Sequence, residues 1–119
     1  MTKRKRKNGL HTRYYDNGQQ LSEEHYNDGM LEGKWTFWYE NGVKNFEATY
    51  KNDELNGLGT SWHENGQKRT EIIFKDGKLD GLGTKWHENG QKQTEETYKY
   101  DELIASKCWD EEGNEEECD

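Results

Sequence analysis

Hydrophobic residues recur along this chain at a fixed interval of 24 residues, with polar stretches between them. Each interval holds two runs of about six residues whose polarity alternates, a pattern typical of β-strands and too short for helices. In one such run the two faces alternate as Leu58, Thr60, Trp62 and Glu64 against Gly59, Ser61 and His63. The pattern therefore predicts one β-hairpin in every interval.

Two turn signals bound these strands in each repeat. Asn-Gly pairs such as Asn65-Gly66 recur every 24 residues and supply the positive φ angles that tight hairpin turns require. The second turn is expected near Asp28-Gly29, Asp53-Glu54, Asp76-Gly77 and Asp101-Glu102. The residues expected to be structural in successive repeats are Trp38, Trp62, Trp86 and Trp109; Tyr26, Tyr50, Phe74 and Tyr98; Leu31, Leu55, Leu79 and Leu103; and Gly33, Gly57 and Gly81.

The expected fold is all-β: an elongated meander of stacked antiparallel hairpins with about nine strands and no globular core. Three large side chains per unit contribute under about 10 kcal/mol, less than the cost of ordering 24 residues at roughly 1–2 kcal/mol each. Units must therefore stack, with Trp on Trp and Tyr on Tyr. The chain forms one repeat domain, residues 1–119, with units at about 9–32, 33–56, 57–80 and 81–104, a degenerate cap at 105–119 and a basic tail at 1–8.

Composition alone would favour disorder, because only 28% of the residues are hydrophobic, 35% are charged and the net charge is −8. The periodic aromatic residues, 13% of the chain, outweigh that expectation. The longest aliphatic-aromatic run, Ile72-Ile73-Phe74, is far shorter than a membrane span.

The basic amino terminus is not followed by an apolar segment, so no signal peptide is expected in this chain. The predicted location is the cytoplasm, and the alternative is that a longer exported precursor has been trimmed.

Cys108 and Cys118 lack the spacing of a zinc site. In a reducing compartment two thiols are favoured over the alternative, one disulfide across the final turn.

Catalytic sets are absent from the sequence. His63 and His87 would lie on neighbouring hairpins, but their repeat position holds tyrosine or aspartate elsewhere, which indicates an exposed face rather than a metal site. An acidic ladder repeats at Glu23, Glu47, Glu71 and Glu95, and we expect a solvated stripe partly neutralised by Lys68, Arg69 and Lys92. We expect no enzyme, no cofactor and no metal.

Aromatic residues provide the candidates for partner binding. Trp35, Phe37 and Tyr39 are expected on the face opposite Trp38, so the second unit would carry aromatic rings on both sides. The alternative is local packing against the first unit, at His11, Arg13 and Tyr15. The predicted contact residues are Trp35, Phe37, Tyr39, His63 and His87.

The unit that runs from Phe74 to Lys92, Phe-Lys-Asp-Gly-Lys-Leu-Asp-Gly-Leu-Gly-Thr-Lys-Trp-His-Glu-Asn-Gly-Gln-Lys, resembles the MORN repeat in its bacterial variant form. The resemblance covers about Gly9 to Asn114 and departs from the pattern at Ala105, where glycine is expected. Arrays of this variant are often assigned to the YwqK family of antitoxins. The resemblance therefore implies a non-enzymatic module that binds a protein partner, a toxin among the candidates.

Residues Lys3 to Lys7 form a basic run that raises an alternative function, binding to a phospholipid membrane surface. Nucleic acid is disfavoured as a partner, because the rest of the chain is acidic and would repel it. Protection of an exposed sheet edge from aggregation is favoured over nucleic-acid binding as the role of this run.

Overall fold

A computed structural model describes residues 8–118 as a single antiparallel sheet. Its path is β1-β2-β4-β5-β6-β7-β9-β10-β11-β12, with β3 paired to β2 and β8 paired to β7. The strands are β1 (Gly9–Tyr14), β2 (Gln20–Asn27), β3 (Met30–Leu31), β4 (Gly33–Trp38), β5 (Lys44–Lys51), β6 (Glu54–Trp62), β7 (Lys68–Lys75), β8 (Lys78–Leu79), β9 (Gly81–Trp86), β10 (Lys92–Lys99), β11 (Glu102–Trp109) and β12 (Glu115–Glu116).

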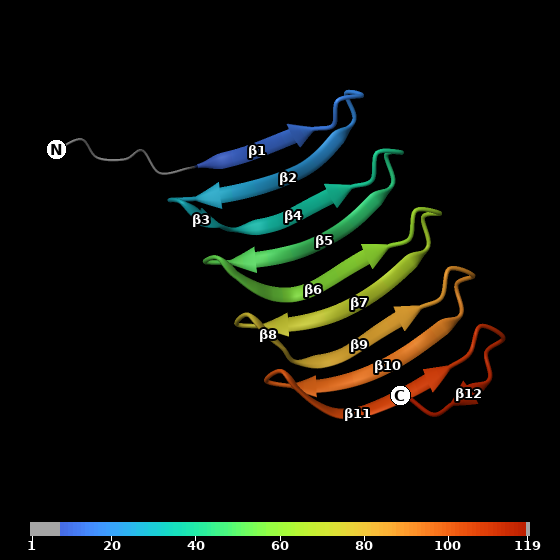
Figure 1. Ribbon diagram of the computed structural model, residues 1–119. Helices are drawn as coiled ribbons and strands as arrows, with labels where there is room; N and C mark the ends of the chain where they lie inside the picture. The colour runs from blue at the N-terminus through green and yellow to red at the C-terminus, as the bar shows by residue number, and fades with distance from the viewer. Residues whose placement is uncertain (1–7, 119) are drawn as a thin grey trace.

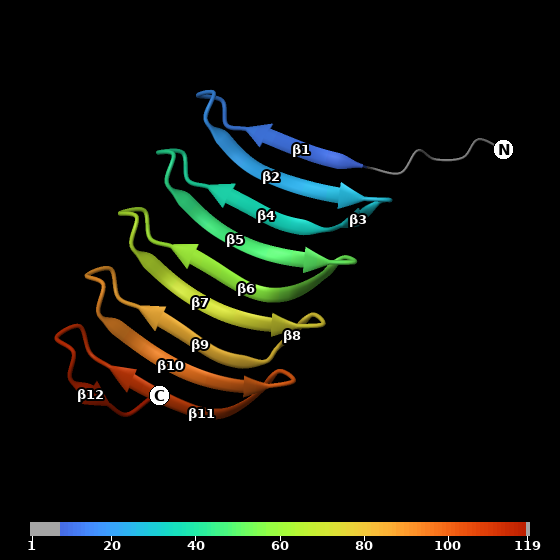
Figure 2. The ribbon, with the colours of Figure 1, turned by 180° about the vertical axis from the view of Figure 1, so that it is seen from behind.

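The predicted all-β meander is confirmed: nine strands have six to nine residues, and three short strands of two residues add to them. The hairpins lie side by side in one layer that measures 62 × 37 × 17 Å, and both faces of the sheet remain open (Figures 1 and 2). No helix that could cross a membrane occurs among the described residues. The basic run Lys3 to Lys7 lies outside the described part of the chain.

The Asn-Gly turns line up along one end of the sheet (Figure 1). In each turn the glycine has a φ near +90°, as Gly66 does, and its backbone N–H donates to the carbonyl three residues earlier, that of His63. Glycine adopts this conformation without steric penalty. The first predicted turn signal is thus confirmed at its expected places.

At the other end the predicted turn positions are one residue late in two units. The positive φ angles fall on Asn52-Asp53 and Tyr100-Asp101, in place of Asp53-Glu54 and Asp101-Glu102. Both pairs are in register with Asp28-Gly29 and Asp76-Gly77, which turn as predicted. Turns whose second residue is aspartate precede the continuous strands β6 and β11. Turns whose second residue is glycine precede an interrupted strand, divided into β3 and β4 in one unit and into β8 and β9 in another. The array therefore alternates with a period of 48 residues.

The aspartates that replace glycine also join consecutive units. The backbone N–H of Asp53 donates to the carbonyl of Leu31 over 3.0 Å, and the Asp53 carboxylate accepts a hydrogen bond from the Leu31 N–H over 2.6 Å. Asp101 makes the same two bonds with Leu79, at 2.8 and 2.7 Å. Asparagine and aspartate tolerate the left-handed conformation because their side chains can bond to nearby backbone groups.

Cross-strand partners divide the side chains between two faces of the sheet. The face that we call the aromatic face carries Trp35 opposite Ala48 and Phe37 opposite Phe46. The face that we call the glutamate face carries the four repeated glutamates; the first three each lie opposite a threonine of the next strand, and Glu95 lies opposite Thr84 of the preceding strand and Lys107 of the next. The repeated tyrosine or phenylalanine of each unit lies opposite a leucine and a glycine, as Tyr50 lies opposite Leu55 and Gly33.

The interior of this sheet is minimal. Ala48 is the one buried hydrophobic residue of the described chain, and the buried polar residues include Thr36, Thr60 and Thr84. Glycine makes room for a ring at Gly59, where an added Cβ would lie 3.1 Å from the Phe74 ring. The prediction that the fold lacks a globular core is confirmed.

Two expectations about packing and pairing are wrong. Within residues 8–118 no ring contact joins the repeated tryptophans; the Lys44 ammonium instead lies 5.7 Å from the ring centre of Trp62, and Lys68 lies 5.9 Å from that of Trp86. A lysine between successive rings is favourable because a cation is attracted to an aromatic face. The cysteines also differ from expectation: Cys108 and Cys118 form a disulfide, with Cα atoms 5.3 Å apart, since β12 folds back beside β11.

Candidate functional site

Hydrogen bonds from one repeated side-chain position hold consecutive hairpins together at the Asn-Gly end. The hydroxyl groups of Tyr15 and Tyr39 donate to the backbone carbonyls of Trp38 and Trp62 in the next unit, each over 2.5 Å. His63 and His87 occupy the same position in later units, and their Nε2 atoms lie 3.0 Å from the carbonyls of Trp86 and Trp109. Three of the five predicted contact residues, Tyr39, His63 and His87, therefore join units to one another.

The histidine position is not the exposed face that the sequence suggested. His63 is 8% exposed, and its Nδ1 accepts a hydrogen bond from Arg69 Nε over 3.4 Å. Because a carbonyl can only accept, Nε2 carries the proton that bonds to Trp86. Both ring nitrogens of His63 are thus engaged, and no group of three or more metal-ligating side chains occurs in the described range.

A second set of bonds between units uses the turn asparagines. In the third unit Asn65 Nδ2 donates to the carbonyl of Glu88 over 2.9 Å, while Asn65 Oδ1 accepts from the backbone N–H of Gln67. Each turn asparagine makes the equivalent pair of bonds. Asparagine is suited to this position because it combines an acceptor and a donor, whereas aspartate has no donor when ionised.

Trp35 and Phe37, the other two predicted contact residues, lie together in an aromatic cluster on the aromatic face. The ring of Trp35 lies 4.8 Å from that of Phe37, 6.4 Å from Phe46 and 5.4 Å from Tyr50, with tilted or edge-on geometry. The rings contact one another within their own hairpin, and Phe37 also lies opposite Ser22 of the first unit. In the described part of the chain no ring contact joins the cluster to His11 or Tyr15, which the alternative named. All four rings are half-buried, and the buried Trp35 Nε1 makes no hydrogen bond within residues 8–118.

The first and fourth units replace this cluster with tyrosine–glutamate pairs. Tyr26 donates to the Glu24 carboxylate over 2.5 Å, and this hydrogen bond together with burial raises the pKa of Tyr26. Tyr98 donates to Glu96 over 3.0 Å. Burial is the larger cause and this hydrogen bond the next, and both raise the pKa of Tyr98. The aromatic cluster is therefore confined to the second unit.

A continuous row of alternating threonine and glutamate crosses the glutamate face. Pairing places its members opposite one another in the order Thr12, Glu23, Thr36, Glu47, Thr60, Glu71, Thr84 and Glu95, with Lys107 at the end. Lys44, Lys68 and Lys92 each bond to the glutamate three residues later, at 3.0, 2.6 and 3.1 Å.

This row is half-buried rather than the solvated stripe that was expected. Burial favours a raised pKa at Glu47, but hydrogen bonds from Lys44 and Thr36 outweigh it and lower the pKa of that carboxyl. Lys68 and Lys92 neutralise glutamates as predicted, whereas Arg69 contacts His63 instead. The arrangement is a network of paired charges.

Beside the Thr–Glu row, three exposed aliphatic side chains form what we call the aliphatic row: Leu58, Ile73 and Leu82. They are 49%, 41% and 46% exposed. Leu58 lies opposite Ile73, and β9, which carries Leu82, is the other neighbour of β7. The three residues thus occupy adjacent strands on one open face, which makes them the clearest apolar surface on that side of the sheet.

Sequence reasoning missed the aliphatic row although its signal was present. Leu58 and Leu82 each lie between two glycines. Consecutive residues of a strand face opposite sides of the sheet, so Ile72 and Ile73 must lie on different faces. The register that aligns the three residues comes from the turns, and a single strand does not display it.

The MORN repeat variant family matches four segments of this chain, residues 7–28, 31–52, 55–76 and 79–100. A search of curated proteins finds no match. The four segments follow the 24-residue step, and together they span well over half of the chain. In the structure each segment ends at the turn opposite the Asn-Gly end. The chain therefore belongs to the MORN repeat variant family.

Proposed function

We propose that this protein is a non-enzymatic protein–protein interaction module that contacts its partner through the glutamate face, centred on the aliphatic row. MORN repeats are in general repeat modules that bind proteins or membranes, and the family is generally non-enzymatic. The observation that carries the proposal is the exposure of Leu58, Ile73 and Leu82 on three neighbouring strands.

The surroundings of the aliphatic row suit a protein surface. Interfaces combine an apolar centre with a polar rim. Here the paired Lys68–Glu71 and Lys92–Glu95 lie along one side of the row and supply such a polar rim. The hydrogen bonds between units fix neighbouring hairpins relative to one another, so the three side chains of the aliphatic row keep fixed relative positions.

Direct binding of a candidate protein partner tests this proposal. The triple variant Leu58→Ser, Ile73→Ser and Leu82→Ser should weaken binding by at least about tenfold, because each residue removes apolar contact area from the interface. Leu10→Ser is the matched control: Leu10 is an equally exposed leucine, in β1 at the far edge of the sheet. Equal binding by the wild type and the triple variant would contradict the proposed surface.

The antitoxin role is a narrower form of the same proposal, in which the partner is a toxin. Co-expression with a toxin-like protein encoded beside this chain tests it: rescue of growth by the wild type, and loss of rescue with the triple variant, would support it. Rescue that is independent of the aliphatic row would place toxin binding elsewhere on the molecule.

Membrane binding is the alternative outcome. The described residues 8–118 carry 12 Lys and Arg against 24 Asp and Glu, a net charge of −12, which opposes adsorption to an anionic surface. Attraction to such a membrane would have to come from Lys3 to Lys7. Co-sedimentation with anionic phospholipid vesicles that is lost on deletion of these residues would favour a lipid-binding function.

A further inference from the structure

The carboxyl-terminal edge of the sheet lacks the partner strand that every earlier unit has. The strands β1, β4, β6 and β9 each pair with a following strand of eight residues, whereas β11 is followed by β12, which pairs only with Cys108 and Trp109. Residues Glu102 to Lys107 therefore have no partner strand on this side within the described chain. An unpaired edge strand is a template for another strand.

Apolar side chains are exposed along this open edge. Leu103 is 49% exposed and Ile104 is 59% exposed, whereas Leu31, Leu55 and Leu79, at the same repeat position as Leu103, are half-buried. The difference follows from the missing strand, because a following hairpin covers the leucine in each earlier unit. β11 thus exposes both backbone hydrogen-bonding groups and apolar area.

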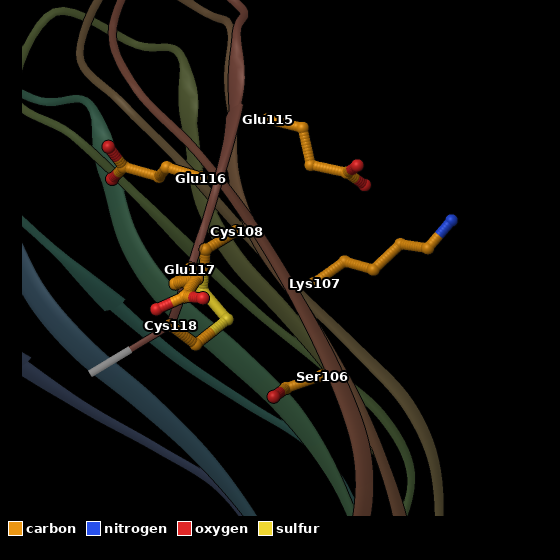
Figure 3. A pocket seen from close by; sticks show the side chains of 7 residues that line it. All are labelled: Ser106, Lys107, Cys108, Glu115, Glu116, Glu117 and Cys118. Atoms are coloured by element: carbon orange, nitrogen blue, oxygen red, sulfur yellow. A yellow bond between two sulfur atoms is a disulfide. The ribbon is translucent and has the colours of Figure 1, made fainter.

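A disulfide-anchored tail partly caps the edge. The Cys108–Cys118 bond holds the final residues beside β11, and the Asp110 carboxylate accepts hydrogen bonds from the backbone N–H groups of Glu112 and Asn114. Between tail and strand lies a cavity of about 530 Å³ lined by Ser106, Lys107, Cys108, Glu115, Glu116, Glu117 and Cys118 (Figure 3). The tail therefore stands where a strand paired with Lys107 would have to lie.

We propose that β11 is a dimerisation edge for a second copy of this chain and that the Cys108–Cys118 disulfide controls access to it. With the disulfide intact the tail blocks the edge at Lys107 and the protein is monomeric. Reduction by a dithiol transfers two electrons and two protons to the two sulfur atoms, oxidises the dithiol to its own disulfide, and releases the tail. The edge is then open from Glu102 to Lys107.

The sequence of the edge is self-complementary, which identifies the occupant as a second copy. A two-fold axis between Ile104 and Ala105 places Glu102 opposite Lys107 of the partner subunit, and Leu103 opposite Ser106 of the partner subunit. Two Glu–Lys pairs then flank an apolar centre, a favourable cross-strand arrangement. Head-to-tail stacking is disfavoured, since β11 and β1 run in the same direction and would pair in parallel, whereas the two-fold arrangement is antiparallel and closed.

Sedimentation equilibrium of the full chain, with and without excess dithiothreitol, tests the proposal. We expect the mass of 14.1 kDa for the oxidised protein and twice that mass after reduction. The double variant Cys108→Ser and Cys118→Ser should dimerise without reductant. Far-UV circular dichroism verifies that each variant keeps its sheet. A monomer both before and after reduction of the wild type would overturn the proposal.

Charge exchange identifies the edge. Glu102→Lys and Lys107→Glu should each weaken the reduced dimer by about tenfold, since each change occurs twice in a two-fold interface, and the double exchange should restore it. Glu54→Lys is the matched control, because Glu54 holds the place of Glu102 one 48-residue period earlier, in the internal strand β6. Another surface would be responsible for association if the dimer dissociation constant were unchanged by the single exchanges, or if the double exchange raised it further.

Discussion

The Nε2 atom of His63 lies 3.0 Å from the backbone carbonyl oxygen of Trp86, one unit further along the sheet. The same bond is made by tyrosine in earlier units, as from Tyr39 to Trp62. Histidine and tyrosine are interchangeable here because both reach the carbonyl with a ring-borne donor. The position varies in residue type while its donor function is kept.

Replacement of His63 tests the importance of this donor. His63→Phe should lower the free energy of unfolding by about 1–3 kcal/mol, because the Trp86 carbonyl loses its side-chain donor in a partly buried place. His63→Tyr should retain most of the stability. Urea unfolding measures both values. Equal stability of the Phe and Tyr variants would show that the ring, and not the hydrogen bond, matters.

Asn65→Asp removes a single donor from the turn. The substitution keeps the oxygen that accepts from the Gln67 N–H and deletes the Nδ2 that donates to Glu88. We expect a loss of about 0.5–1.5 kcal/mol in urea unfolding. Asn27→Asp is the control, since the Asn27 side chain makes no hydrogen bond within residues 8–118. If the two variants lose the same stability, the change in charge explains the effect.

Glu47 gives the stability a dependence on acid pH. Its pKa is lower in the folded state than its ordinary value of 4.5, so folding favours the ionised form. This contribution is fully present above the unfolded pKa and is lost as pH falls through the folded pKa. Urea midpoints measured from neutral to acid pH should fall less in Glu47→Gln than in the wild type. The same acid dependence in both proteins would contradict this assignment.

Gly33→Ala tests the backbone conformation of the strand entry. Gly33 has a φ of +89°, and the atom nearest to an added Cβ, the Cβ of His25, is 3.9 Å away. The change should destabilise by about 1–2 kcal/mol through backbone strain alone. Thermal unfolding measures it. Ala105→Gly at the equivalent position of β11 is the comparison, because Ala105 does not have a positive φ and should gain no stability from glycine.

The fold was predictable from the sequence because each 24-residue unit repeats the same local signals. The turn at Asn65-Gly66, the alternation around Trp62 and the number of long strands all depend on local geometry. The turn at Asn52-Asp53 was misplaced because Asp53, which holds the place of Gly29, was aligned with Asp28 instead.

The candidate site was less predictable because it depends on which strands lie side by side. Ring-bearing residues such as Tyr39 and His63 suggested a binding surface, but the stagger between units directs their donors to the next hairpin. The Cys108–Cys118 pairing depends on the path of β12, which is only two residues long and has no periodic signal.

Within the described range Ala48 is the one buried apolar residue of the sheet. This affects how the stability of the protein depends on temperature. The heat-capacity increase on unfolding reports newly hydrated apolar area, and here most of that area is already partly hydrated in the native state. The increment per residue should therefore fall below the usual value of about 12–15 cal/mol/K. The stability curve would then be flat, so that the protein weakens little on cooling and resists cold denaturation.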